Sequence, residues 1–354
     1  MSVISVRLRV AGPLLFRAPG EFTPTARGPQ AFARSLPLPT PSTIAGCLAT
    51  AAGRRPAGQV TSWARAVEEV LNLGERGYLR GPYLIADDRI YVGFGDKVVD
   101  VDSLKSLERV DLLEELTKGQ SLDSLLSSLL HAQDVKKVQR VGTGLTATKA
   151  VDREHGLMYL AEMVDYESTF ETSEVSIAVD AHHIDLSGAA ERIVRLGGEG
   201  KVTRIELATE EETTLWKRVE RSLKRLSKSV YLCLITFAFL ETPSKELELL
   251  ARGAWLWPSF IRPVKKLVQE SVAGCVRVEY VVGEVMLLGA GFDLLRGVRK
   301  PCYIALKPGT VIKVRVERGE PANVIRDLYE RGLSMHGGRL GYGTFIPVRA
   351  KEVA

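Results

Sequence analysis

The stretch Val230-Tyr-Leu-Cys-Leu-Ile-Thr-Phe-Ala-Phe-Leu240 is the longest strongly apolar run in this chain of 354 residues. It has 11 residues, whereas a helix needs about 20 apolar residues to cross a bilayer. We therefore predict a buried strand that opens the second half of the protein, and we expect no membrane partner. Residues 1–10 alternate between apolar and polar positions, which is typical of a strand and not of an export signal, so we expect a cytoplasmic protein.

Outward from this strand, both halves of the sequence follow a similar order of elements. The first half has an expected strand at 3–10, a helix at 41–52, a hairpin of 78–86 with 89–94, and strands at 157–164, 174–182 and 202–207. The second half has an expected helix at 214–227, the strand at 230–240, strands at 276–288 and 302–316, a helix at 321–330 and a closing strand. We predict an α+β fold with two ferredoxin-like (RRM-like) βαββαβ domains. They cover residues 1–212, with a polar helical insertion at about 100–137, and residues 213–354.

The composition is that of an ordinary folded protein. Charged residues make up 26% and hydrophobic residues 45%, which excludes a disordered, collagen-like or coiled-coil chain. Four cysteines are too few for a disulfide framework. Each lies in an apolar segment, so we interpret Cys47, Cys233, Cys275 and Cys302 as core residues and not as metal ligands. Only two residues are asparagine, which favours a thermophilic source.

The net charge of +5 hides a segregation along the chain. Residues 1–55 contain seven arginines and one acid, and residues 295–318 contain seven basic residues and one acid. Residues 215–228 add six basic residues against Glu220, whereas residues 152–191 contain ten acids and one arginine. Basic segments that the fold brings together would form a cationic surface for phosphates, with the acidic segment facing elsewhere, toward a protein partner. The alternative is a set of solvated faces that never converge.

Two glycine-rich loops carry the strongest local signal. They are Leu196-Gly-Gly-Glu-Gly-Lys201 and His336-Gly-Gly-Arg-Leu-Gly-Tyr-Gly-Thr-Phe345. Glycine permits positive φ and lets backbone N–H groups approach a ligand closely. Neither loop has the spacing of a nucleotide-binding signature. The residues alone therefore leave two alternatives, an anion-binding loop and a plain tight turn.

The segment from Arg34 to Gly46 predicts another anion site at the start of a helix. Thr40 is a suitable N-cap, and Pro41 suits the first helical position. The free N–H groups of such a helix start, with Ser42 and Thr43 beside them, can hold a phosphate.

Catalytic and metal sites have weak support in the sequence. The segment Asp180-Ala-His-His-Ile-Asp185 is the one compact cluster of potential metal ligands. Strand alternation puts its two histidines on opposite faces, so we predict no metal and no cofactor. A metal-free ribonuclease needs a general base, for which His336 is the first candidate and His155 the second. The sequence leaves three interpretations of the aromatic segment Trp255–Phe260: it stacks on bases, it anchors a protein partner, or it packs between the two domains.

Five separate stretches, in order along the chain, carry a resemblance to a known family. They are Leu36-Pro-Leu-Pro-Thr-Pro-Ser-Thr-Ile-Ala-Gly46, residues 147–159 with Arg153-Glu-His-Gly-Leu-Met-Tyr159, Leu196–Lys201, residues 289–311 with Gly289-Ala-Gly-Phe-Asp-Leu294 and Pro308-Gly-Thr-Val311, and the loop Gly337–Gly343. In these stretches the chain resembles the type III-B CRISPR (Cmr) effector subunit of the RAMP superfamily, the third member of that complex.

The resemblance implies a non-catalytic subunit of an RNA-guided antiviral effector complex. Such a subunit binds the 5′ tag of the crRNA and packs on the large polymerase/cyclase-like subunit and the backbone RAMP subunits. In this chain the resemblance implies RNA contact by Ser42, Thr43, Lys149, Gly197, Gly198, Lys201, Gly338, Arg339 and Tyr342. Lys201 stands where the family more often has arginine, which keeps the charge but loses bidentate phosphate geometry.

Two other functions stay open at this point. The same superfamily includes metal-independent endoribonucleases that process crRNA, and His336 would be the general base of such an enzyme. The other function is a purely structural scaffold that contacts only protein.

Overall fold

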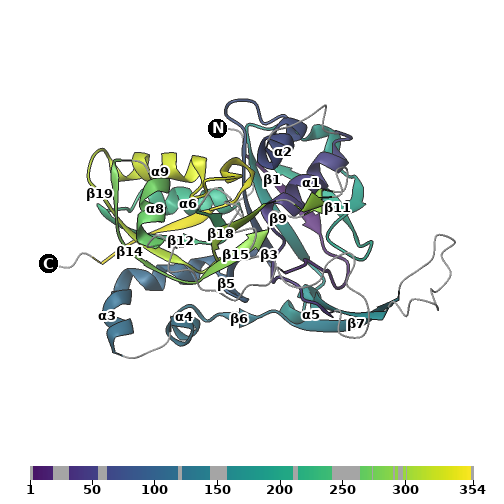
Figure 1. Cartoon of the computed structure of the whole chain (residues 1–354), viewed down its shortest axis with the longest axis horizontal. Coiled ribbons are helices and arrows are strands. Elements are labelled where there is room, and N and C mark those ends of the chain that lie inside the picture. Colours follow the sequence, from purple (N-terminus) through teal and green to yellow (C-terminus); the bar gives the residue numbers. More distant parts are fainter. Residues whose placement is uncertain are drawn as a thin grey trace.

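The structure, a computed structural model, is a mixed α+β protein built on antiparallel sheets, with two halves side by side (Figure 1). None of the helices in the described part of the chain is long and apolar enough to cross a membrane. The described residues are 3–18, 32–54, 62–118, 122–143, 158–209, 214–240, 264–272, 274–289, 292–293, 298–299 and 301–351.

An eight-stranded sheet forms the first half, in the order β10-β11-β1-β9-β3-β4-β5-β6. Strand β1 (Val3–Arg9) lies between β11 (Val202–Thr209) and β9 (Val175–His182), antiparallel to both. The predicted hairpin is confirmed, and its turn at Asp87-Asp88 has positive φ at both residues, as a tight two-residue hairpin requires. The other strands are β3 (Tyr78–Ala86), β4 (Arg89–Phe94), β5 (Lys97–Asp100), β6 (Gln133–Asp134) and β10 (Ile193–Arg195).

Two helices cover this sheet near the junction with the second half. Helix α1 (Pro41–Ala51) begins at a proline, whose missing N–H has no partner at a helix start anyway, and it packs against α2 (Trp63–Leu71). Residues Ile44, Ala45 and Leu48 of α1 are at most 1% exposed. A smaller sheet combines β2 (Phe32–Ala33), β8 (Met158–Val164) and β7 (Lys137–Thr143), followed by α5 (Tyr166–Phe170).

The second half contains a four-stranded sheet in the order β14-β19-β12-β20. Figure 1 shows helices α6, α8 and α9 on one face of this sheet and α3 and α4 on the other. The strands are β12 (Ser229–Leu234), β14 (Val276–Val282), β19 (Val311–Val316) and β20 (Phe345–Arg349), and the three covering helices are α6 (Leu215–Leu223), α8 (Val264–Ser271) and α9 (Pro321–Arg331).

Three long strands predicted for the second half are each divided in the structure. The run 230–240 leaves the sheet after Leu234 and resumes as β13 (Ala238–Phe239) in a second sheet, with β18 (Cys302–Leu306) and β15 (Val285–Gly289). The break is held by side-chain bonds, because the Thr236 hydroxyl donates to the Gly341 carbonyl at 2.7 Å and accepts from the Thr344 amide at 2.9 Å. The hydropathy pattern cannot reveal such a change of sheet, because the residues before and after the break are both buried. A short pair, β16 (Phe292–Asp293) and β17 (Val298–Arg299), follows β15.

The predicted insertion is helical, as expected, but it is not a polar appendage. Its helices η1 (Val101–Arg109), α3 (Leu112–Thr117) and α4 (Leu122–Leu130) pack beneath the second-half sheet. Leu104, Leu107 and Leu126 are at most 1% exposed and belong to the same hydrophobic cluster as Val230. Burying each leucine contributes about 1.5–3 kcal/mol. The insertion therefore supplies one wall of the second half's core.

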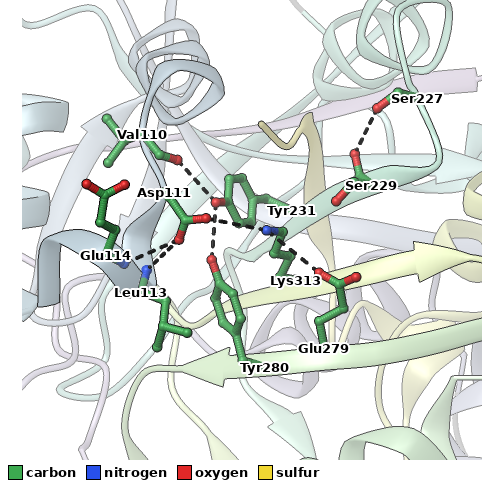
Figure 2. A network of polar contacts seen from close by, with 10 residues as sticks. All are labelled: Val110, Asp111, Leu113, Glu114, Ser227, Ser229, Tyr231, Glu279, Tyr280 and Lys313. Atoms are coloured by element: carbon green, nitrogen blue, oxygen red, sulfur yellow. Dashed lines mark hydrogen bonds and ion pairs between the residues drawn. The ribbon is translucent and has the colours of Figure 1, made fainter. Parts of the chain in front are cut away.

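A buried lysine joins this insertion to the sheet (Figure 2). The Nζ atom of Lys313 lies 3.7 Å from the carboxylates of both Asp111 and Glu279, and its side chain is only 5% exposed. The Tyr231 hydroxyl donates to the Val110 carbonyl at 3.1 Å. Lys313 belongs to the basic segment 295–318, so one cation of that segment is used inside the protein and is not available to a phosphate.

Candidate nucleic-acid interface

A cavity of about 280 Å³ lies where the two halves meet. The first half contributes Arg34 and Ser35, the residues 36–39 and Pro41 of the first family-like stretch, and Gly93 and Gly95. The second half contributes Ile235–Phe237 at the break after β12, with Lys307 and Pro308. The proline-rich motif thus forms a rigid apolar wall, and the other half of the protein completes the cavity.

Three cations and one carboxylate line the cavity: Arg34, Lys137, Lys307 and Asp96. Lys137 forms an ion pair with Glu162 at 2.9 Å, and Lys307 pairs with Glu284. Arg34 is exposed, and no carboxylate within the described residues pairs with it. Its guanidinium group lies 5.7 Å from the centre of the Phe32 ring. Arg34 is therefore a free cation beside an apolar cavity.

The start of α1, predicted as an anion site, is occupied by the protein's own hydroxyl groups. The Ser42 hydroxyl lies 2.9 Å from the Tyr342 hydroxyl and 3.1 Å from that of Thr40. The Thr43 hydroxyl lies 3.0 Å from the same Thr40 oxygen, and the Thr43 amide donates to the Thr40 carbonyl. Thr40 is the N-cap residue, as predicted, but its side chain makes no capping bond to the helix backbone. Ser42 thus connects α1 to the second half, whereas Thr43 bonds to Thr40 at the start of the same helix.

The first glycine loop is a hairpin turn between β10 and β11. The Gly198 amide donates to the Leu15 carbonyl at 2.8 Å, and the Leu196 amide donates to the Lys201 carbonyl at 2.9 Å. A Cβ atom at Gly197 would lie 2.5 Å from the Leu15 carbonyl oxygen, so this glycine is required by a close backbone approach. Gly197 is exposed, while Gly198 and Lys201 are half-buried. The loop remains a surface on which Lys201 can meet an anion.

The second glycine loop, 337–343, is buried between the two halves. The amides of residues 340–343 all donate to carbonyl groups of the protein. A Cβ atom at Gly338 would lie 2.3 Å from the Arg331 carbonyl oxygen, and one at Gly341 would lie 2.6 Å from that of Gly81 in β3. The prediction that this loop offers a cradle of free amides to an anion is therefore wrong. The glycines instead let backbones of the two halves approach closely.

Arg339 and Tyr342 are engaged inside the protein as well. The Arg339 guanidinium donates to the carbonyls of Leu73 at 3.3 Å, Gly74 at 2.5 Å and Gly77 at 2.7 Å, and it lies 3.5 Å from the Glu68 carboxylate. It thereby satisfies carbonyl groups just after α2, where a cation is favourable. Tyr342 is 2% exposed, so its ring is not available for stacking on a base. The sequence indicated chemistry suitable for RNA at both residues and missed their packing role.

A fully buried group of polar residues, which sequence reasoning missed, lies beneath this loop. Arg80, Asp180 and His182 are all 0% exposed. The Arg80 guanidinium donates to the carbonyls of Tyr329 at 2.5 Å and Gly338 at 2.8 Å, both in the second half. Knowledge of the pairing between β3 and β9 would have suggested this group, because that pairing places Arg80 directly opposite Asp180. Period-two alternation along a strand does not distinguish a buried face from an inter-domain face.

Asp180 connects the two halves through its carboxylate. It accepts a hydrogen bond from the Tyr83 hydroxyl at 2.6 Å and another from the Trp216 amide at 2.6 Å, at the start of α6. Burial raises the pKa of Asp180 to about 7, although these two hydrogen bonds act in the opposite direction. Its neighbour His182 stacks on Tyr78 with ring centres 4.2 Å apart, and burial followed by the charge of Arg80 lowers the pKa of His182 to about 2.

We expect Asp180 to make the stability of the protein depend on pH. The pKa rises from 3.8 to about 7 on folding, so the folded state holds this proton more tightly and the free energy of unfolding falls as pH rises from 4 to 7. Asp180→Asn imitates the protonated carboxyl. It should therefore remove this pH dependence, which amounts to a change of at most roughly 4 kcal/mol in the free energy of unfolding between pH 4 and pH 7. Urea denaturation at several pH values measures it, with Asp88→Asn in the exposed hairpin turn as control. Parallel wild-type and Asp180→Asn profiles would contradict the assignment.

Within the described residues, no group of three potential metal ligands gathers. His183 is exposed and His182 buried, so the two histidines do face opposite ways. The His336 ring lies 4.8 Å from that of Tyr303, and burial lowers its pKa. Cys47 and Cys233 are buried as predicted, whereas Cys275 is exposed. Lys149, His155 and the aromatic segment Trp255–Phe260 lie outside the described residues.

Comparison with known proteins assigns the chain to a family. The model of a family described as CRISPR-associated protein (Cas_Cmr3) matches residues 7–138 and 126–349. The chain belongs to the Cmr3 family. The chain is also similar, with 22% identity over 348 residues, to the CRISPR system CMR subunit Cmr3 of Saccharolobus solfataricus, covering 96% of this chain and 95% of that protein. The resemblance that the five stretches indicated is thus confirmed, and this Cmr3-family chain is a type III-B subunit.

Solved structures share the fold of this Cmr3-family chain. A chain in the cryo-EM structure of the type III-B Cmr-beta bound to cognate target RNA matches with a TM-score of 0.55 and 19% identity, covering 97% of this chain and 96% of that one. A chain in the same complex with target RNA and AMPPnP, in state 1, matches with a TM-score of 0.54 and 17% identity, covering 96% and 94%. At these identities the likeness shows the fold.

Proposed function

We propose that this chain is a non-catalytic RNA-binding subunit of a type III-B CRISPR effector complex in antiviral defence. It binds the 5′ tag of the crRNA and packs on the large polymerase/cyclase-like subunit and the backbone RAMP subunits. The family membership supports the role in a complex. The observation that carries the RNA-binding role is the cavity at the junction of the halves, with apolar walls and the exposed cation Arg34, which no described carboxylate pairs with.

The strand orders support the ferredoxin-like part of the proposal. In the first half, the central strands run β11-β1-β9-β3, and in the second they run β20-β12-β19-β14. Numbered within each half, both orders are fourth, first, third, second, which is the order of a βαββαβ unit. Helices α1 and α8 each follow the first strand of their unit, and α9 precedes the last strand of the second. Two such units, meeting at the cavity, are what we propose for the domains 1–212 and 213–354.

The chemistry of the cavity fits one nucleotide of a single strand. An unstacked base needs an apolar slot, which the prolines and Phe237 provide, and its phosphate needs a cation at the rim, which Arg34 provides. A guanidinium group can bind two phosphate oxygens at once. Lys201 on the exposed β10–β11 turn can add a further phosphate contact. Among the other predicted RNA contacts, Ser42, Gly338, Arg339 and Tyr342 hold the two halves together, and Thr43 bonds within the start of α1.

Reversing the charge of Arg34 tests the proposal. In the reconstituted effector complex, we expect Arg34→Glu to weaken retention of tag-bearing crRNA and to lower the slope of log affinity against log salt by about 0.7, the value of one phosphate contact on a single strand. Lys266→Glu, an exposed lysine of α8 that lines neither cavity, makes the same charge change and should behave as wild type. Equal crRNA retention by wild type and Arg34→Glu would support a scaffold that contacts only protein.

A further inference from the structure

A second cavity, of about 180 Å³, lies entirely apart from the junction cavity, with which it shares no lining residue. It lies between η1, α6 and β20, the edge strand of the second-half sheet. The charged groups that line this groove, which we call the α6 groove, are the cations Lys105, Arg218, Arg221, Arg225 and Arg349 and the carboxylates Asp102 and Glu108.

The periodicity of α6 places its arginines in this groove. Leu215, Val219 and Leu223 are buried on one side of the helix, which fixes the opposite side toward solvent. Arg221 lies on that side in the last turn of α6, and Arg225 lies in the turn that follows the helix; both are exposed and line the groove. Arg349, from the end of β20, lines the same groove. The end of α6, the turn after it and β20 thus bring three guanidinium groups to one groove.

The carboxylates do not neutralise these arginines. Asp102 is already shared by Arg218 and Lys105, each at 2.8 Å. No ion pair with Arg221, Arg225 or Arg349 occurs within the described part of the chain. Unpaired cations that share a groove repel one another, and a bound anion relieves that repulsion. Guanidinium groups suit a phosphate, because their fixed fork of donors matches two of its oxygens.

The surroundings of the α6 groove favour a nucleic acid over an acidic protein. Protein interfaces bury an apolar or aromatic centre, and this groove offers none at its surface. Val101, Leu104, Ile346 and Val348 line it, but each is at most 4% exposed and forms the floor. No aromatic side chain lines it to stack on a base. The groove presents cations and the Ser222 hydroxyl to the solvent. These groups are suited to contacts with a sugar-phosphate backbone.

We propose that the α6 groove is a second nucleic-acid site, which binds the phosphodiester backbone of a single strand without reading its sequence. This goes beyond the proposed function, which concerns one nucleotide in the junction cavity. The groove contacts phosphates through Arg221, Arg225 and Arg349, and the buried floor keeps these side chains on a rigid support. Because phosphates are the only groups recognised, binding is governed by salt and not by base identity.

The test uses the full-length protein and a fluorescein-labelled oligouridylate, with affinity measured by fluorescence anisotropy over a range of salt concentrations. We expect Arg221→Glu/Arg225→Glu to weaken binding at low salt by about tenfold or more and to lower the log–log salt slope by about 1.4, which is two single-strand contacts. Lys265→Glu/Lys266→Glu on α8 makes the same charge change at exposed positions that do not line the groove, and it should retain wild-type affinity.

A second variant keeps the test valid if charge reversal disturbs folding. Arg221→Gln/Arg225→Gln removes the charge with good helix formers and should give a smaller loss of affinity with the same fall in slope. The proposal is overturned by a wild-type protein that does not bind the oligouridylate, by an unchanged salt slope in the variants, or by tighter binding of polyglutamate than of RNA. These results leave the Arg34 experiment unaffected, because it uses other residues and a tag-bearing crRNA.

Discussion

Replacing Arg80 by methionine is expected to lower the free energy of unfolding by about 3–5 kcal/mol. Arg80 is fully buried, and its guanidinium donates to the carbonyls of Leu79 and Tyr329, both at 2.5 Å, and of Gly338 at 2.8 Å. Burial lowers its pKa to about 10, so it stays charged at neutral pH. Methionine fills much of the space but removes three hydrogen bonds from a charged donor, which are stronger than neutral ones, while the Tyr329 and Gly338 carbonyls keep only a backbone donor each.

Urea denaturation of the full chain measures this loss. The control is Arg89→Met on the neighbouring strand, because Arg89 is exposed and should change stability by no more than about 0.5 kcal/mol. Arg80→Lys adds a graded comparison: it keeps the charge but not the planar fork, so we expect it to fall between wild type and Arg80→Met. An Arg80→Met protein as stable as the Arg89→Met control would show that the buried guanidinium does not hold the halves together.

The second large effect is expected at Gly343. Its φ is +69°, and a Cβ atom there would lie 2.5 Å and 2.6 Å from the Leu333 backbone carbon and nitrogen. Gly343→Ala adds the cost of the left-handed conformation, about 1–2 kcal/mol, to the displacement of packed backbone, about 1–3 kcal/mol. We therefore expect a total loss of stability of about 2–5 kcal/mol, measured by thermal or urea denaturation.

Gly200 in the first glycine loop is the matched control. Its φ is +67°, close to that of Gly343, but nothing lies within 4 Å of its Cβ position. Gly200→Ala should therefore cost only the conformational part, about 1–2 kcal/mol. The difference between the stability losses of Gly343→Ala and Gly200→Ala measures the contribution of close packing around the second loop. Equal losses would mean that the loop 337–343 is no more tightly packed than an exposed hairpin turn.

The two glycine loops show how far local sequence reasoning reaches. Positive φ recurs at glycines in both loops, as glycine permits, but the residues alone left open whether each loop is an anion site or a tight turn. The sequence could not say whether the glycines make room for a ligand or for the protein's own backbone. At Gly341 the neighbour is the Gly81 carbonyl, some 260 positions away in the sequence. The same limit applies to Arg339, whose five donors suit a phosphate and a set of helix-end carbonyls equally well.

The basic segments show the same limit for charge. Segment 295–318 was predicted to help form a cationic surface, yet Lys307 pairs with Glu284 and Lys313 is buried between Asp111 and Glu279. Segment 215–228 keeps Arg221 exposed at the end of α6 and Arg225 exposed in the turn after it. A count of charges along the chain cannot distinguish these cases, because the carboxylates that neutralise Lys313 come from two other segments. Among the described residues that line the junction cavity, Arg34, which the sequence showed only as the start of a motif, is the cation without a carboxylate partner.

Much of this protein was determined by its sequence alone: the type of most elements, the hairpin at Asp87-Asp88, and membership of the Cmr3 family. These features depend on contacts between residues close in the sequence or on the order of motifs, and both can be read directly from the amino-acid sequence. The tertiary structure alone decided that 230–240 divides between two sheets, that the insertion completes the second core, and that the second glycine loop is buried. Each of these features depends on which distant segment of the chain packs against the element in question. Neither the hydropathy pattern nor the charge pattern along the sequence identifies that segment.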